Sequence, residues 1–270
     1  MLHIILMIYR ALFARKLFYR LNKILYHCSL SGLGVLNYED DTVSGEGWFL
    51  KKYLKGRLDG VVFDVGANVG DYSRLVLQVS PKATLYAFEP HPKTFTVLKS
   101  SLHQSNFFPV NAAAGEKEGV LSLYDYEAND GSAHASLYQD VIENIHKAKS
   151  IECKVQVLSL GAFAKSKNIE KIDLLKIDTE GNELSVLNGI VEYIEAGKVE
   201  TIHFEFNEMN ISSRTYFRDF WNLLPNYDFY RLLPDGMAKI EKYNPVFCEI
   251  FAYQNIVAIL KHDSTMGRIK

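Results

Sequence analysis

Acidic and amide side chains in this sequence follow apolar runs of strand length. Five of them stand at or just after the end of such a run: Asp64, Glu89, Asn111, Asp178 and Glu205. Ligands of open α/β sheets lie beyond the carboxyl ends of the strands. If these runs are neighbouring parallel strands, the five side chains converge on one edge of a sheet. The pattern therefore predicts a ligand site at that edge.

The first of these runs leads into a glycine turn. Gly66 and Gly70 flank Asn68, and apolar residues then recur with helical period over 72–79. Glycine lets backbone N–H groups approach a ligand closely, and the start of a helix directs its positive end toward the same place. The segment is typical of the strand, turn and helix that open a nucleotide-binding α/β domain.

The residue types around this turn favour S-adenosylmethionine over a dinucleotide. The spacing is Gly-x-x-x-Gly, whereas dinucleotide folds use Gly-x-Gly-x-x-Gly. Asp64 suits a ligand that carries an ammonium or sulfonium group, and Glu89 is placed to accept both hydroxyls of an adenosine ribose. Asn111 and Ala112 begin a run of small residues, 111–115, where an adenine ring has room against the backbone.

A second dense cluster follows the run 172–177. Methyl transfer from a sulfonium to an alcohol is an in-line displacement that depends on alignment, and the alcohol must lose its proton. Asp178 is our first candidate for the proton acceptor, and Glu180 follows it on the turn. Lys176, on the same strand face as Asp178, is expected to pair with a carboxylate or contact the substrate. Glu205 is a fourth catalytic candidate.

Several of these side chains also have plainer interpretations. Glu183 would stabilise the start of a helix through its negative charge. Glu205 and Asn207 would either complete the pocket or bond the loops at the sheet edge. Trp48 and Tyr53 precede the first strand and are expected in the core, although the segment could cover the ligand. His134 is expected to be a surface loop residue, with a role as a base worth testing.

The metal requirement stays open at this stage. Asp178, Glu180 and Glu205 carry oxygen ligands of the kind that hard divalent ions accept. Their spacing matches no diagnostic metal-binding pattern. A divalent metal is therefore neither indicated nor excluded.

The composition fits one large α/β domain. The chain has 270 residues, 48% of them hydrophobic, and a net charge of −2, which gives no support to a nucleic-acid binder. Cys28, Cys153 and Cys248 lie far apart, which argues against a disulfide framework or zinc site and for a reducing compartment. We expect a cytoplasmic protein.

The N-terminal segment differs in charge from the rest. Residues 1–37 contain five basic and no acidic residues, and one helical face is expected to carry Phe13, Leu17, Leu21 and Leu25. That face would either pack on the domain or rest on the inner face of an anionic membrane as a peripheral contact through residues 1–30. Charges interrupt every apolar run well before the roughly 20 residues of a spanning helix, and the segment lacks the features of a cleaved signal. We expect a basic amphipathic helical arm and cap over 1–56.

Strand and helix patterns alternate over the remaining residues, 57–270. This alternation predicts a single domain with a mainly parallel sheet and helices on both faces. The expected core strands are 61–63, 84–88, 107–110, 172–177, 199–206, 227–232 and 255–260, with added strands at 120–125 and 155–158.

Four motifs in this order, FDVGANVG, FEP, NAAAG and KIDTEGNE, resemble those of the FkbM family of S-adenosylmethionine-dependent methyltransferases. The resemblance covers roughly residues 60–210. It implies a seven-stranded Rossmann-like class I methyltransferase domain and O-methylation, often of sugar hydroxyls in glycans, glycolipids or related metabolites. By position, Asp64, Gly66, Asn68 and Gly70 match the cofactor turn, Glu89 matches the ribose-binding acid, and Asp178, Glu180 and Glu183 match the acidic segment.

The acceptor implied by the resemblance is a small molecule or glycan, and the loop 131–138 carries no signature of which one. Three other functions are weighed against this one. A nicotinamide-dependent oxidoreductase would need the missing glycine pattern and a Tyr-x-x-x-Lys dyad after the middle strands. A methyltransferase acting on nucleic-acid amines would need a Pro-Pro turn at 178–181, and the chain has no Pro-Pro pair. The third is a non-catalytic nucleotide-binding module on the same fold.

Overall fold

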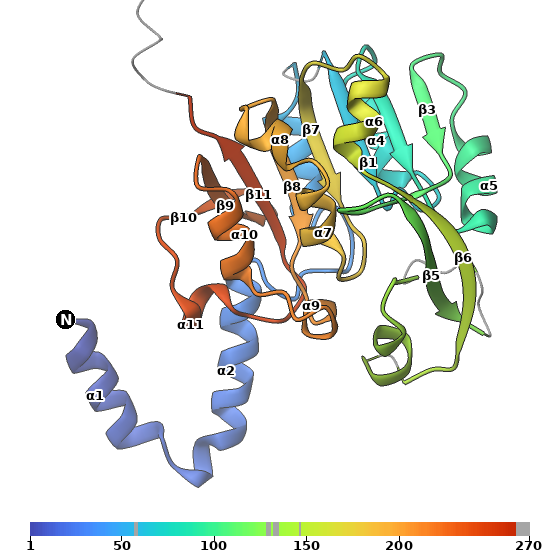
Figure 1. Ribbon diagram of the computed structural model, residues 1–270. Coiled ribbons are helices and arrows are strands. Elements are labelled where there is room, and N and C mark those ends of the chain that lie inside the picture. The colour runs from blue at the N-terminus through green and yellow to red at the C-terminus, as the bar shows by residue number, and fades with distance from the viewer. Residues whose placement is uncertain (57–58, 128–130, 132–134, 146, 263–270) are drawn as a thin grey trace, which may run out of the picture.

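The main sheet of the protein holds eight strands among the residues that the structure, a computed structural model, describes: 1–56, 59–127, 131, 135–145 and 147–262. The strand order is β10-β9-β11-β8-β7-β1-β2-β3 (Figure 1). Five neighbouring strands are parallel, as expected: β1 (Val61–Val65), β2 (Thr84–Phe88), β3 (Phe107–Val110), β7 (Ile172–Ile177) and β8 (Val199–Glu205). These strands read as apolar runs because helices cover both faces of the sheet.

The expectation of seven strands is wrong by one. The seventh expected strand, β11 (Asn255–Leu260), inserts antiparallel between β8 and β9 (Tyr227–Leu233). An eighth, β10 (Gly236–Ile240), pairs with β9 through a two-residue turn, Pro234 and Asp235. A Pro-Asp-Gly sequence between two runs is a turn signal that predicts such a hairpin. The edge strand β10 was not predicted because it lacks the run of apolar residues that marks a buried strand.

Successive residues of the central strands serve two hydrophobic cores. Phe63 and Leu175 point into one core, beneath α6 (Leu160–Ser166), α7 (Glu183–Asn188), α8 (Val191–Glu195) and α10 (Phe217–Leu223). Val62 and Leu174 point into the other, beneath α4 (Asp71–Val79), α5 (Pro92–Ser101) and the π-helix Phe49–Tyr53. This alternation follows from the two-residue period of a strand. The predicted arrangement of helices on both faces is confirmed.

A smaller sheet stands beside the main one (Figure 1). Its order is β4-β6-β5, with β4 (Ala113–Ala114), β5 (Gly119–Tyr126) and β6 (Ser150–Leu158). The two added strands are thus confirmed, and β4 is a further short one. β4 lies within the small-residue segment 111–115 that follows β3. The small sheet therefore lies next to the predicted ligand site.

The N-terminal arm consists of two helices rather than one continuous amphipathic helix. α1 (Leu2–Phe13) and α2 (Tyr19–Gly32) meet at a bend that contains the 3-10 turn Lys16–Phe18. At the bend, the Asn22 side-chain amide donates to the carbonyl of Phe13 at 3.0 Å, which takes the place of a helical hydrogen bond to that carbonyl. Phe13 and Leu17 consequently do not continue the face of Leu21 and Leu25, as the sequence predicted.

The arm extends away from the domain (Figure 1), and many of its apolar side chains are exposed. Leu17, Leu21 and Leu25 are 84%, 43% and 43% exposed, so the alternative in which this face packs on the domain is wrong. Leu30 is the buried residue of α2. In the described part of the chain, no helix combines the length and apolarity that crossing a membrane requires.

Two predictions fall on residues outside the described ones. His134 is one of them. The other is the boundary between the arm with its cap and the domain, placed at 56/57, because residues 57–58 are also outside the described set. The domain boundary stays a prediction.

We expect Gly66→Ala to destabilise the fold. Gly66 has a φ of 80°, and a Cβ atom there would lie 1.7 Å from the Asp178 carbonyl oxygen. Backbone strain and the clash should together lower the free energy of unfolding by at least about 2 kcal/mol. Urea denaturation followed by circular dichroism measures this value. Gly119→Ala is the control, because nothing lies within 4 Å of a Cβ at that position. Equal stability of the two variants would contradict the prediction.

Candidate functional site

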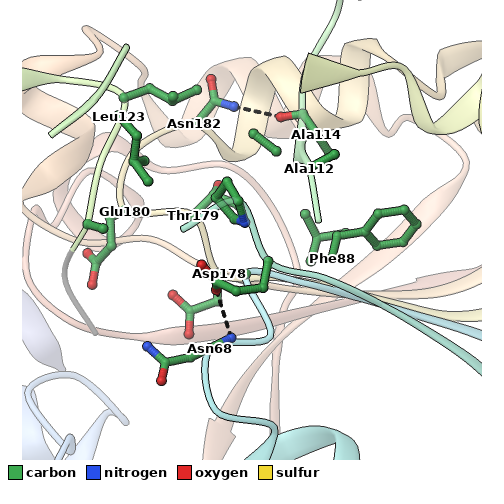
Figure 2. A pocket seen from close by; sticks show the side chains of 16 residues that line it. Asn68, Phe88, Ala112, Ala114, Leu123, Asp178, Thr179, Glu180 and Asn182 are labelled. Atoms are coloured by element: carbon green, nitrogen blue, oxygen red, sulfur yellow. Dashed lines mark hydrogen bonds between the residues drawn. The ribbon is translucent and has the colours of Figure 1, made fainter. Parts of the chain in front are cut away.

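A cavity opens where the ends of β1, β2 and β7 face the small sheet (Figure 2). Its walls come from the glycine turn, the segment after β2, the alanines around β4, the small sheet and the acidic segment after β7. The lining residues are Val65, Gly66, Asn68, Phe88, Glu89, Pro90, Ala112, Ala113, Ala114, Leu123, Ala135, Leu137, Asp178, Thr179, Glu180 and Asn182. Segments far apart in the sequence therefore meet at the carboxyl edge of the sheet, as predicted.

The glycine turn is held between β2 and β7. The Gly66 and Ala67 N–H groups donate to the Phe88 carbonyl at 2.9 and 3.0 Å, and the Asp178 N–H donates to the Val65 carbonyl at 2.9 Å. Gly66 and Asn68 have left-handed backbones, with φ of 80° and 49°. Asparagine tolerates this conformation better than most residues. The turn thereby presents its backbone, rather than a side chain, to the cavity.

Both carboxylate oxygens of Glu89 accept backbone hydrogen bonds beside the cavity. One oxygen accepts the Asn68 N–H at 3.0 Å, and the other accepts the His91 N–H at 2.7 Å. The side chain is 6% exposed. Burial raises the pKa of Glu89 to about 7, and the two hydrogen bonds from His91 and Asn68 oppose that rise. Glu89 is thus held in place, and its carboxyl group gains or loses a proton near neutral pH.

Part of the cavity lining is apolar, and we refer to this part as the apolar slot. Its residues are Ala112, Ala113, Ala114, Leu123, Ala135 and Leu137, and Figure 2 shows Ala112, Ala114 and Leu123 among them. The Asn182 amide donates to the Ala114 carbonyl at 2.9 Å and so ties the slot to the acidic segment. Nothing in the sequence marks Leu123, Leu137 and Asn182 as cavity residues, because alternation along 120–125 and a polar loop do not indicate what these side chains face.

Three residues predicted to bind the cofactor do not line the cavity. The Asn111 amide donates to the carbonyls of Glu89 at 2.8 Å and Pro90 at 3.0 Å, so it holds the loop. Gly70 precedes α4 with a φ of 92°. Asp64 is buried behind the turn, where it accepts the Ser73 hydroxyl at 2.6 Å, and burial raises its pKa to about 6.

A buried charge cluster adjoins the cavity at Asp178. The Lys176 ammonium is 3% exposed and lies 3.2 Å from an Asp178 oxygen and 4.0 Å from a Glu46 oxygen. Burial lowers the pKa of Lys176, but the charges of Asp178, Glu46 and Glu205 outweigh burial and raise that pKa well above its usual value. Lys176 therefore stays charged and pairs with Asp178, the first of the two roles considered for it.

Glu46, which was not among the predicted site residues, lies on α3 (Glu46–Trp48) ahead of the first strand. Its oxygen is also 3.7 Å from His203 on β8. His203 contacts the Tyr72 hydroxyl and the Asn255 amide oxygen, each at 3.0 Å, and burial together with Lys176 lowers its pKa well below the usual value. His203 is hence a neutral link between α4 and β11. No local pattern marks Glu46 or His203, because they meet only through the sheet order.

Glu205 and Asn207 bond the loops at the sheet edge. An Asn207 amide hydrogen bond joins the two side chains at 3.2 Å, and Asn207 accepts the Met209 N–H at the start of α9 (Met209–Ser212). Neither residue lines the cavity. Burial raises the pKa of Glu205 well above its usual value, Asp178 raises it further, and Lys176 opposes both.

Glu180 and Glu183 have different surroundings. Glu180 lines the cavity with a left-handed backbone, φ of 51°, and its carbonyl accepts the buried Ser136 hydroxyl at 2.8 Å. Glu183 is 1% exposed and accepts the N–H groups of Thr179 and Gly181 at 3.1 and 3.0 Å. Glu183 therefore closes the turn before α7, in agreement with its plainer interpretation.

Two other questions from the sequence concern a metal and the aromatic cap. No group of three His, Cys, Asp or Glu residues within the described ranges could hold a metal ion. Trp48 and Tyr53 stack on each other with ring centroids 6.5 Å apart and pack against the second core. Their predicted packing role is confirmed.

The chain matches the family model for the methyltransferase FkbM domain over residues 64–230. It is 28% identical to "Methyltransferase 1" of Beauveria bassiana (49% of this chain, 59% of that protein). It is 25% identical to "2-O-methyltransferase NoeI" of Sinorhizobium fredii (66% and 76%). It is 26% identical to "Hexuronic acid methyltransferase AglP" of Haloferax volcanii (51% and 53%). Two of these alignments thus span little more than half of the relative. The family match covers more than half of the chain, which therefore belongs to the FkbM methyltransferase family.

Proposed function

We propose that the protein is an S-adenosylmethionine-dependent O-methyltransferase that methylates a sugar hydroxyl in a glycan, glycolipid or related metabolite. The observation that carries the proposal is the position of Glu89. Its carboxylate is fixed by two backbone N–H groups beside the glycine turn, in the same cavity as Asp178. Glu89 thus suits a ribose diol, and Asp178 offers a proton acceptor in the same cavity.

The cavity residues fit the proposed cofactor. Glu89 would accept the ribose hydroxyls, and the slot between Ala112, Ala113 and Leu123 would hold the adenine ring against apolar surface. The turn at Gly66 leaves backbone exposed for the remaining part. When bound, S-adenosylmethionine supplies an electrophilic methyl group on a sulfonium.

The residues near Asp178 would handle the acceptor hydroxyl. Asp178 lines the cavity with about one third of its side chain exposed, so it can reach a substrate hydroxyl and take its proton. The buried Lys176 ammonium orients Asp178 through the ion pair between them, 3.2 Å long. Glu180 lines the same cavity and is placed to hold a neighbouring hydroxyl. Glu205 would act from outside the cavity, through its electrostatic interaction with Lys176.

The name of one relative supports a sugar acid as the acceptor, and the name of another supports transfer to oxygen. These two relatives carry names that specify a hexuronic acid methyltransferase and a 2-O-methyltransferase. Cavity walls that combine Asp178, Glu180 and Thr179 offer the hydrogen-bond acceptors and donors that a polyhydroxylated substrate needs. A nicotinamide-dependent oxidoreductase or a non-catalytic module are the alternatives that the first experiment addresses.

We further propose that the arm contacts an anionic membrane at its cytoplasmic face. Residues of α1 expose apolar side chains on all sides, including Ile4, Leu6 and Ile8 at 50–56%. An uncovered helix of 12 residues is marginal in water and needs another surface. The five basic residues of the arm, with no acidic residue among them, complement anionic headgroups.

Calorimetric titration tests the cofactor. We expect S-adenosylmethionine and S-adenosylhomocysteine to bind and NAD not to bind. Glu89→Ala should weaken both adenosyl ligands by about 10- to 100-fold, because hydrogen bonds to a charged group are lost. Glu118→Ala, an exposed carboxylate outside the cavity, is the control. Binding of NAD would favour the oxidoreductase, and no binding of any of the three would favour the non-catalytic module.

The affinity for the cofactor should depend on pH through Glu89. Only its carboxylate can accept hydrogen bonds from both ribose hydroxyls, and its pKa is about 7 in the free protein. Protonation therefore competes with binding, and affinity should fall about tenfold as the pH decreases from 8 to 6. Titrations across this range measure the slope. Glu89→Gln should bind weakly with a flat profile, and a wild-type profile that is equally flat would exclude the proposed role.

Asp178→Asn should lower the rate of methyl transfer by at least about 10²-fold and leave cofactor binding intact. The amide keeps the shape of the side chain but cannot take a proton. Single-turnover transfer of a radiolabelled methyl group to a panel of sugars and sugar acids measures the rate. Near-normal turnover would remove Asp178 from the role of base.

A variant lacking residues 1–28 tests the membrane contact and retains the buried Leu30. It should float poorly with vesicles of phosphatidylglycerol, whereas the full chain should float with them. The full chain should float less with phosphatidylcholine alone, because the electrostatic attraction is absent. If both proteins floated equally well with phosphatidylglycerol, the arm would have no part in membrane binding.

A further inference from the structure

Exposed apolar side chains continue from the arm onto the catalytic domain. Five of them lie on loops and short helices, 49–75% exposed, and we refer to them as the apolar rim: Tyr38, Ile211, Tyr216, Val246 and Phe247. Val246 and Phe247 belong to α11 (Pro245–Cys248), and Ile211 belongs to α9. No cavity residue or catalytic candidate is among them.

The rim lies at the same edge of the sheet as the cavity. Strand β11 is antiparallel to β8 and begins at Asn255, directly opposite Glu205 at the end of β8. The segment just before β11, which contains α11, is therefore at the carboxyl edge of the parallel strands. α9 follows β8 at that edge, and Figure 1 shows α9, α11 and α2 at one end of the molecule.

Contacts connect the segments that carry the rim residues. Next to Tyr216, the N–H groups of Phe217 and Arg218 donate to Glu249 at 2.8 and 3.0 Å, just after α11. Tyr216 also meets the Phe251 ring, with centroids 6.1 Å apart. These contacts connect the region after α9 to the segment that carries Val246 and Phe247.

Other contacts join the rim to the base of the arm. The Arg231 guanidinium donates to the Phe247 carbonyl at 2.9 Å, and a Cβ on Gly34 would lie 3.2 Å from Arg231. The Leu36 N–H donates to the Tyr253 carbonyl at 2.8 Å, and the Tyr38 ring lies 6.1 Å from the Tyr253 ring. The base of the arm, α11 and the region after α9 are thus connected by direct contacts.

Exposed charges of both signs surround the rim, and the adjoining arm adds five basic residues and no acidic one, which favours an anionic partner. Arg214 and Arg218 are exposed on either side of Tyr216, and Lys242 is exposed shortly before α11. Glu249 is bonded inward to backbone N–H groups, whereas Glu241 is exposed beside Lys242, and Glu39 and Asp40 are exposed next to Tyr38. Aromatic side chains flanked by basic ones are typical of surfaces that lie at a lipid headgroup layer.

We propose that the apolar rim inserts into the headgroup region of an anionic bilayer together with the arm, so that the cavity faces the lipid surface. The acceptor would then be a sugar attached to a lipid, presented from that surface. This inference rests on the proposed function for the sugar. A second copy of the chain is a poorer occupant, because pairing two arms would bring five basic residues of each together without an acid between them.

Hydrogen–deuterium exchange on the full chain tests the position of the rim. Vesicles of phosphatidylglycerol and phosphatidylcholine should protect amides of 209–218 and 244–250, in addition to the arm. Amides of 95–101 in α5, outside the rim, should exchange at the same rate with and without vesicles. Protection of the arm alone would overturn the proposal for the rim.

Substitution in the rim gives an independent test. Val246→Ser with Phe247→Ser should weaken vesicle binding by about tenfold or more, since two apolar side chains lose their burial. Val97→Ser with Val120→Ser is the matched control, with original exposures of 50% and 53%, and should bind like the wild type. Unchanged binding of the rim variant would contradict the proposal. So would a dimer in light scattering that dissociates on rim substitution, combined with no vesicle protection.

Two acceptor substrates distinguish a failure of the proposed role of the rim from a failure of the proposed function. The rim variant should methylate a soluble methyl glycoside at the wild-type rate and an alkyl glycoside inserted in vesicles at least about fivefold more slowly. If neither glycoside nor any sugar is methylated while vesicles still protect the rim, the proposed function fails and the lipid contact stands. If both glycosides are methylated equally by the variant and the wild type, the rim has no role in presenting the acceptor.

Discussion

The site depends on the close approach of the loops after β1 and β7. The Asp178 N–H bonds the Val65 carbonyl, and the Asp178 carbonyl occupies space that any side chain at Gly66 would need. This contact places the glycine turn and the acidic segment on the same cavity, although more than 100 residues separate them. Glu89 then fastens the turn from the other side through the Asn68 N–H. The cofactor half and the acceptor half of the proposed site are thus built on one backbone contact.

Charge neutralisation is the second requirement of this edge of the sheet. Asp178, Glu46 and Glu205 approach one another in a region with little water, where unpaired carboxylates would be costly. Lys176 supplies a buried positive charge among them and remains protonated for that reason. The pair of Lys176 with Asp178 leaves part of Asp178 exposed to the cavity. A carboxylate that is oriented by a buried lysine and still exposed to the cavity can accept a proton from a substrate.

Elements outside the main sheet give the site its particular form. The small sheet contributes Leu123 and, through the neighbouring segment, Ala135 and Leu137 to the apolar slot. Residues before the first strand contribute Glu46, which lies outside the segment matched by the family model. The arm and the apolar rim extend the same end of the molecule with exposed apolar and basic side chains. The main sheet and its cavity are thereby combined with the small sheet, the arm and the apolar rim, which lie outside the main sheet.

The sequence by itself determined the strand ends, the glycine turn, the family and the two-faced sheet, because these depend on local periodicity and on motifs with fixed spacing. It placed Glu89 and Asp178 on the cavity correctly, since each directly follows a parallel strand. Tertiary structure alone decided that Asn111 bonds a loop, that Asp64 lies behind the turn, and that Glu46 and His203 join Lys176. It also decided that β10 adds an eighth strand and that the arm bends. Such outcomes depend on which distant groups meet after the sheet has formed, and no local pattern encodes those meetings.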